Sequence, residues 1–181
     1  TAIELARECE AAARAVDARI RNSEGGTVST HATRHCYANS HGFIGSQTTS
    51  RHSLSAAVIA ESADAMQRDY WYSAARCADD LLSAANVGRI AGERTVRRLD
   101  GRRIKTGQYP VVFEAPIAGS LLGHLVQAVS GGSLYRKSSF LLDSLGTEVC
   151  ADIITIDEDP FVLRGLASGC CDDEGVATRQ R

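Results

Sequence analysis

The chain has 181 residues, of which 44% are hydrophobic and 23% are charged, and its formal net charge is −2. This composition is ordinary for a globular domain and gives no electrostatic reason to expect a nucleic acid or an acidic membrane surface as a partner. No apolar run approaches the roughly eighteen residues of a membrane span, and the chain does not start with a signal-peptide pattern. We therefore expect a cytoplasmic protein without nucleic-acid or membrane partners.

A first helix is predicted at the start of the chain. Thr1 and Glu4 have the spacing of a capping box, in which the hydroxyl and the carboxylate each accept a hydrogen bond from a backbone N–H. Apolar residues then recur at helical spacing as far as Ile20, and turn residues at 22–26 end the helix.

A long antiparallel hairpin is predicted for residues 27–60, because small polar and β-branched residues surround a turn at residues 39–42. Three of its histidines raise the question of a metal site. His31 and His35 share one face but lie roughly 13 Å apart along an extended strand, too far for a single ion. His52 could lie opposite one of them, so adventitious metal binding at His31, His35 and His52 stays open.

A third strand is predicted around residues 69–76. Alternation places Tyr70 and Tyr72 on one face and Trp71 on the other. An aromatic cluster beside a polar sheet could bind an extended peptide, but packing in the core or at a domain interface is the commoner role and is favoured here.

A second amphipathic helix is predicted after this strand, capped by Asp79 or Asp80 and ending near residues 100–101. Arginines lie between its apolar residues and, with those that follow, form the only basic cluster of the chain. The cluster has neither interleaved aromatic residues nor a nucleic-acid motif, so we interpret it as a solvated helix face.

An apolar stretch at residues 118–132 follows a short hydrophobic run at residues 111–113, a pattern that predicts a strand leading into a helix. Its apolar residues recur at spacings of three and four, which is typical of one buried helical face: Leu121, Leu122, Leu125, Val126 and Val129. Gly131 and Gly132 can take the left-handed conformation that closes a helix. A further strand is predicted at residues 151–157.

These elements predict an α+β fold in which an antiparallel β-hairpin and sheet are flanked by helices, and a buried central helix follows a short strand. We divide the chain into residues 1–107, with the first helix, the sheet and the second helix, and residues 108–181. The second part contains the short strand, the buried helix and the start of the following region.

The six cysteines are scattered without a Cys-x-x-Cys pair. Neither a zinc knuckle nor a disulfide framework is indicated, so we expect reduced thiols. The neighbours Cys170 and Cys171 could be redox-active or bind a soft metal, although adjacent cysteines in a loop are more often incidental.

Five blocks of the sequence are long, ordered and individually unusual: NSHGF (39–43), RHSLS (51–55), RDYWYS (68–73), GHLVQAVSGGSLYRKSSFLLDSLG (123–146) and GLASGCCDDEGVATR (165–179). Together they resemble the TldD/PmbA family of peptidases, also named modulators of DNA gyrase, and specifically its PmbA (TldE) branch. The resemblance covers nearly the whole chain. Because members of the family are substantially longer, it implies that this chain is a central fragment of a longer protein.

TldD-type chains of this family carry a His-Glu-x-x-x-His motif that binds zinc and supplies a general base. In this chain Gly123 and Ala128 stand at the two histidine positions, and His124 stands at the glutamate position. Catalytic zinc needs about three protein ligands, and glycine and alanine side chains offer none. The resemblance therefore implies that this chain has no catalytic residue, metal ligand or cofactor of its own.

The resemblance implies a non-metal-binding PmbA/TldE-type subunit of a heteromeric zinc metallopeptidase. Its partner would be a TldD-type subunit that holds the zinc, and its substrate an unfolded peptide admitted to a shared compartment. Such a chain is catalytically inactive alone.

Two other functions stay open. An independent hydrolase could use His124 with a thiol such as Cys150 or Cys170, because a thiolate beside an imidazole is chemically sound, but no pattern indicates that they meet. An interaction or regulatory protein would fit the name modulator of DNA gyrase.

Overall fold

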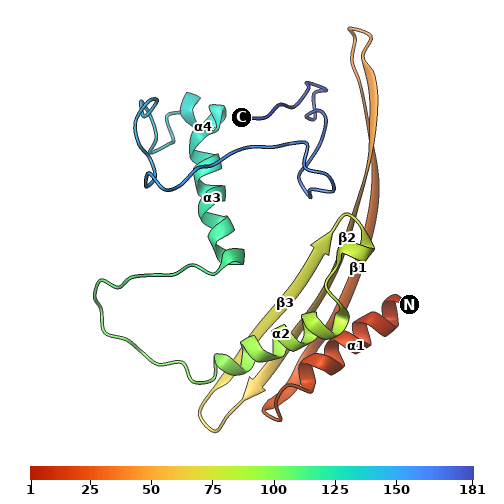
Figure 1. The fold of residues 1–181 in the computed structure, drawn as a ribbon, viewed down its shortest axis with the longest axis vertical. Coiled ribbons are helices and arrows are strands. Elements are labelled where there is room, and N and C mark those ends of the chain that lie inside the picture. Colours follow the sequence, from red (N-terminus) through yellow and green to blue (C-terminus); the bar gives the residue numbers. More distant parts are fainter. The chain divides into compact units, whose positions relative to one another are not determined.

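The computed structural model describes residues 1–181. They form two compact units, one made of Thr1–Arg102 and Asp157–Arg181 and the other of Arg103–Ile156, and each is described by itself. The first unit contains α1 (Ala2–Arg14), β1 (Ile20–Ala38), β2 (Ile44–Glu61), β3 (Met66–Ala75), η1 (Ala78–Asp80) and α2 (Ala84–Arg97) (Figure 1). The second unit contains α3 (Ala115–Val129) and α4 (Gly131–Tyr135).

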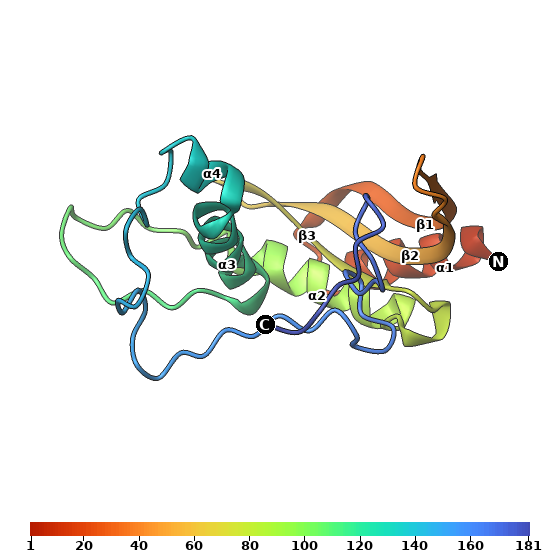
Figure 2. The same ribbon diagram turned by 90° about the horizontal axis from the view of Figure 1, so that it is seen from above.

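The first unit is built on a three-stranded antiparallel sheet in the order β1-β2-β3. Both α1 and α2 lie along the same face of this sheet (Figures 1 and 2). The hairpin of β1 and β2 continues well past the end of β3, so its far half has no third strand beside it. A three-stranded antiparallel sheet with flanking helices is the predicted α+β class.

The core lies between the sheet and the two helices. Alternate residues of β2 are buried there, and they meet Cys9 and Ala13 of α1 and Val87 and Ala91 of α2. The two helices approach each other at Gly88, where an added Cβ would lie 2.1 Å from the backbone oxygen of Cys9. A glycine at this position therefore permits the close helix contact. The buried residues of β2 are Leu54, Ala56, Val58 and Ala60.

The capping box at the start of α1 is confirmed. The Thr1 hydroxyl accepts a hydrogen bond from the Glu4 N–H at 3.3 Å, and the Glu4 carboxylate accepts from the backbone nitrogen of Thr1. The predicted extension of this helix to Ile20 is wrong, because the chain turns at Asp17, whose carbonyl accepts from the Ile20 N–H at 3.0 Å. Ile20 begins β1 and is buried against the sheet core.

The predicted hairpin is confirmed and is longer than expected. Its turn is held by the Asn39 side chain, whose Oδ1 accepts from the N–H groups of His41 (3.0 Å) and Phe43 (3.2 Å). Gly42 has a φ of +89°, a left-handed conformation that favours glycine. An Asn-initiated turn of this kind is a local signal, which is why the sequence located it.

The third strand and its alternation are also confirmed. Tyr70 and Tyr72 stack on the open face of the sheet with ring centroids 6.4 Å apart. Trp71 points to the helical face, where it packs on the core and lies under the guanidinium of Arg94, 4.9 Å from the ring centroid. Trp71 therefore has the core role that the sequence favoured.

The second helix begins later than predicted. Its N-cap is Ser83, whose hydroxyl accepts from the Asn86 N–H at 3.3 Å, and neither Asp79 nor Asp80 caps it. These two aspartates lie in the short η1 turn, and Leu81 after them is extended. The chain therefore leaves helical geometry between η1 and α2.

In the second unit the helix predicted at residues 118–132 is present as α3, but the prediction that it is buried is wrong. Four of its leucines and valines are exposed, from 49% for Leu121 to 63% for Val126, and Leu125 is partly buried. Only Ala128 is buried, and its carbonyl accepts from the Ser139 hydroxyl at 2.7 Å. Residues 103–156 contain one other helix, the five-residue α4, which is too short to cover the apolar face.

The strands predicted at residues 111–113 and 151–157 are absent. A strand needs a hydrogen-bonded neighbour, and here Val112 is 96% exposed with no strand beside it. Gly131 and Gly132 do not close α3, which ends at Val129 with Ser130 as its C-cap, but form the first turn of α4. Neither helix of this unit, nor any other in the structure, combines the length and apolarity needed to cross a bilayer.

Candidate functional site

The three positions of the altered zinc motif lie on α3. Gly123 and His124 are exposed, whereas Ala128 is buried. An added Cβ at Gly123 would meet no atom within 4 Å, so this position is open space on the helix surface. The helix presents at these positions one imidazole and no second donor.

The donor set of the chain does not fit a zinc ion. No group of three His, Cys, Asp or Glu side chains is close enough together to hold a metal. In the hairpin, His52 faces Thr30, with 3.2 Å between Nδ1 and Oγ1, and so lies opposite neither His31 nor His35. The assignment of no metal ligand to this chain stays a prediction, as does adventitious binding at the hairpin histidines.

The thiols proposed for an independent hydrolase are not hydrogen-bonded to His124. The one hydrogen bond between cysteine side chains joins Cys170 Sγ to Cys171 Sγ at 3.9 Å. Cys150 is exposed in the same unit as His124, and Cys170 belongs to the other unit. The structure therefore contains no hydrogen bond between His124 and a thiol.

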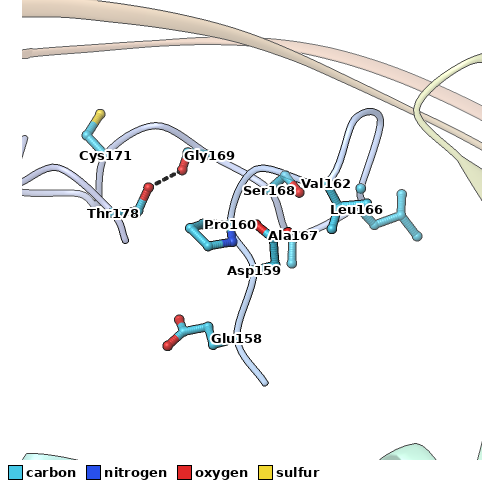
Figure 3. A pocket seen from close by; sticks show the side chains of 11 residues that line it. Glu158, Asp159, Pro160, Val162, Leu166, Ala167, Ser168, Gly169, Cys171 and Thr178 are labelled. Carbon is cyan, nitrogen blue, oxygen red and sulfur yellow. Dashed lines mark hydrogen bonds between the residues drawn. The ribbon is translucent and has the colours of Figure 1, made fainter. Parts of the chain in front are cut away.

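The C-terminal arm (residues 157–181) folds back on itself and encloses a pocket of about 540 Å³ (Figure 3). Its ends are joined by two backbone hydrogen bonds between Glu158 and Arg181, at 2.9 and 3.0 Å. The Thr178 hydroxyl donates to the Gly169 carbonyl at 2.5 Å across the arm. The residues that line the pocket include two carboxylates and several small side chains: Glu158, Asp159, Ala167, Ser168 and Gly169.

Arg76, at the end of β3, attaches this arm to the sheet. Its Nε donates to the carbonyl of Gly165 at 2.7 Å, and its Nη2 donates to those of Leu166 (3.1 Å) and Ser168 (2.9 Å). Hydrogen bonds from a charged donor are stronger than neutral ones. The sequence offered no signal for this role, because the carbonyl acceptors lie about 90 residues further along the chain.

A second contact joins the arm to the hairpin tip, which we define as residues 35–47. Gly175 has a φ of +79° and packs against the tip, where an added Cβ would lie 2.8 Å from the Phe43 ring and 3.1 Å from the Tyr37 ring. The two rings lie 5.9 Å apart. Beside them is a pocket of about 380 Å³ that also reaches Cys170 and Cys171.

The open face of the sheet is the second candidate surface. It carries small side chains on β1 and β2, the stacked Tyr70 and Tyr72, and a paired Glu24 and Arg68. Arg68 donates to both carboxylate oxygens of Glu24 at 2.5 and 2.6 Å, and these hydrogen bonds lower the pKa of Glu24. A shallow pocket of about 290 Å³ lies over this pair. Such a surface could accept an extended peptide.

Family models match almost the whole chain. The PmbA/TldA metallopeptidase central domain matches residues 1–99, and the C-terminal domain of the same family matches residues 106–181. The chain belongs to the PmbA/TldA metallopeptidase family. The family predicted from the five sequence blocks is therefore confirmed.

Curated relatives in the PmbA/TldA family carry the name metalloprotease PmbA. Metalloprotease PmbA of Escherichia coli O157:H7 is 47% identical over 180 residues, which are 99% of this chain and 40% of that protein. The homolog from Haemophilus influenzae is 44% identical over the same length and the same shares of both chains. The chain thus spans about two fifths of the length of these relatives.

Solved structures share the fold. A candidate modulator of DNA gyrase from Bacteroides thetaiotaomicron matches with a TM-score of 0.92 and 28% identity, over 99% of this chain and 41% of that one. TldE from Thermococcus kodakarensis matches with a TM-score of 0.69 and 21% identity, over the same shares. At that identity the second match shows the fold alone.

Proposed function

We propose that the full-length protein is the non-metal-binding PmbA/TldE-type subunit of a heteromeric zinc metallopeptidase that processes unfolded peptides. The observation that carries the proposal is the donor set on α3, where Gly123 and Ala128 leave His124 as the only polar motif residue. Membership of a metallopeptidase family and 47% identity to metalloprotease PmbA support the peptidase context.

In this proposal the chain contributes surfaces, and the partner, a TldD-type subunit, contributes zinc and base. The hairpin extends beyond the third strand and so offers a long surface for assembly. The open sheet face, where Tyr70 and Tyr72 lie beside small side chains, would line the compartment and contact the peptide. No proton transfer or metal coordination is assigned to residues of this chain.

The test is elemental analysis and peptide cleavage on the full-length protein, alone and co-expressed with a TldD-type chain. We expect zinc and cleavage of an unfolded substrate only when the partner is present. His124→Ala should leave both unchanged, as should the control Gln127→Ala on the same exposed helix surface. Stoichiometric zinc in this chain alone, together with loss of cleavage on His124→Ala, would overturn the proposal.

A regulatory role is the second candidate, because the Bacteroides thetaiotaomicron relative is named as a candidate modulator of DNA gyrase. Affinity purification of the full-length protein from its own cells distinguishes the two roles. Recovery of gyrase without a TldD-type chain would favour regulation, whereas recovery of a TldD-type chain without gyrase would favour the peptidase subunit.

A further inference from the structure

The thiols of Cys170 and Cys171 converge. Successive side chains of an extended strand point to opposite faces, yet these two sulfurs lie 3.9 Å apart. Cys170 is exposed and Cys171 is partly buried, so reagents in solution can reach the pair. Two neighbouring thiols on one side of the backbone can bind the same atom.

The backbone on the C-terminal side of the pair is fixed by a tight turn. Asp172 Oδ1 accepts hydrogen bonds from the N–H groups of Glu174 and Val176, both at 2.9 Å. The Cys170 carbonyl accepts from the Thr178 N–H at 3.1 Å, which closes the strands flanking the turn. The backbone that carries the two thiols is therefore held in place before any ligand arrives, which lowers the entropic cost of binding.

The space beside the thiols is aromatic on one side. The pocket of about 380 Å³ at the hairpin tip is lined by both cysteines and by the rings of Tyr37 and Phe43. Gly175 packs directly on these rings, so the turn that carries the thiols is seated against them. A ligand bound to both sulfurs could place an aryl group in this pocket.

The surroundings of Cys171 bear on which ligands the pair can take. The pKa of the Cys171 thiol is raised, first by its hydrogen bond with Cys170, then by desolvation and by the negative charges of Asp172 and Asp173. A soft cation binds thiolates, and these surroundings disfavour the thiolate of Cys171. A trivalent arsenical with an As=O bond instead consumes two neutral thiols: two As–S bonds form, both protons leave with the oxygen as water, and no electrons are transferred.

We propose that Cys170 and Cys171 form a two-thiol binding site for trivalent arylarsenicals, with the aryl group seated beside Tyr37 and Phe43. The site is separate from α3 and does not depend on peptidase activity. It makes the arm and the hairpin tip jointly responsible for ligand binding.

The first test treats native full-length protein with phenylarsine oxide, then locates the adduct by tryptic peptide mass. Arg164 and Arg179 bound the peptide of residues 165–179, which contains both thiols. We expect one phenylarsenic group on this peptide, with loss of one water, removed by 2,3-dimercaptopropanol but not by a monothiol. An unmodified peptide 165–179 would overturn the proposal.

Variants separate chelation from simple thiol reactivity. Cys170→Ser and Cys171→Ser should each weaken binding on the order of 100-fold, because each leaves a single attachment. Cys150→Ser, which removes an exposed thiol elsewhere, should leave binding unchanged. If Cys170→Ser or Cys171→Ser bound phenylarsine oxide as tightly as the unsubstituted protein does, the two-thiol site would be contradicted.

A second pair tests whether the turn organises the site. Asp172→Ala removes the acceptor of two turn hydrogen bonds, whereas Asp173→Ala removes a neighbouring carboxylate that makes none. We expect weaker binding of phenylarsine oxide by the first variant only. Equal affinities would show that adjacency in sequence, rather than the folded turn, brings the thiols together, and would overturn the structural part of the proposal.

Discussion

Helices α2 and α3 have similar lengths and opposite burial. α2 carries four charged residues yet buries six positions against α1 and the sheet. α3 carries no charged residue and buries one position. Burial therefore follows from a partner that approaches closely, which α2 has through its glycines and α1, and not from apolar composition alone.

The largest expected difference between the two helices comes from adding one methyl group. Gly88→Ala places a Cβ against the backbone of α1, and relief of that clash should cost about 2–3 kcal/mol of unfolding free energy. Gly123→Ala on α3 meets no atom within 4 Å and should stabilise its helix by roughly 0.5–1 kcal/mol. Hydrogen exchange of the helix amides in full-length protein measures both changes. Equal changes in stability for Gly88→Ala and Gly123→Ala would contradict the difference in packing between α2 and α3.

Replacing one valine by alanine in β2 and one in α3 gives a smaller contrast in stability. Val58 is fully buried on β2, and Val58→Ala should leave a cavity that costs about 2 kcal/mol. Val126 on α3 is 63% exposed, and Val126→Ala should change stability by no more than about 0.5 kcal/mol. Denaturant unfolding of the full-length variants tests this. A large loss for Val126→Ala would mean that chain outside these residues covers α3.

The buried thiol of Cys9 should make stability depend on pH. Burial raises the pKa of Cys9 from 9.0 to about 11. Its stabilising contribution is complete below pH 9, where the unfolded thiol is also neutral, and is lost as the pH rises through 11. This loss should be of order 1–2 kcal/mol between pH 9 and 11. Cys9→Ala should abolish it, whereas Cys150→Ala should not.

The smallest contrast concerns two serines. Ser83 caps α2, so Ser83→Ala should cost about 1 kcal/mol. Ser120 lies inside α3 and donates to the Ile117 carbonyl, a bond that adds little to a helix, so Ser120→Ala should change stability by less than about 0.5 kcal/mol. Thermal unfolding of both variants tests the ranking, and a larger loss for Ser120→Ala would reverse it.

Local features of the fold could be predicted from the sequence. The capping box at Thr1, the Asn39 turn and the alternation around Trp71 each depend on residues close together in the chain. The end of α1 at Arg14 could not be predicted, because an apolar residue such as Ile20 fits both a helical and a strand pattern. Its place at the start of β1 depends on packing against the sheet core. The prediction of a strand at residues 111–113 failed for the same reason, since the pairing of a strand depends on a partner strand distant in the sequence.

The candidate site was predicted less completely than the fold. The sequence placed Gly123, His124 and Ala128 on one helix, and α3 contains them. It also noted that Cys170 and Cys171 are adjacent, but adjacency does not reveal that their sulfurs converge beside Phe43. Those contacts arise from chain segments more than a hundred residues apart, and no spacing rule encodes them.

Arg76 bears on how modules of this family can be exchanged. The central-domain match ends at residue 99 and the C-terminal-domain match begins at residue 106. Arg76 lies in the first match, yet the carbonyl groups that it binds lie at residues 165–168, in the second. A chimera joined at that boundary would keep these hydrogen bonds only if the first parent supplies an arginine at position 76 and the second parent folds its arm with the same three carbonyl groups facing it. The two matched regions therefore depend on each other for these hydrogen bonds, although they are separate in sequence.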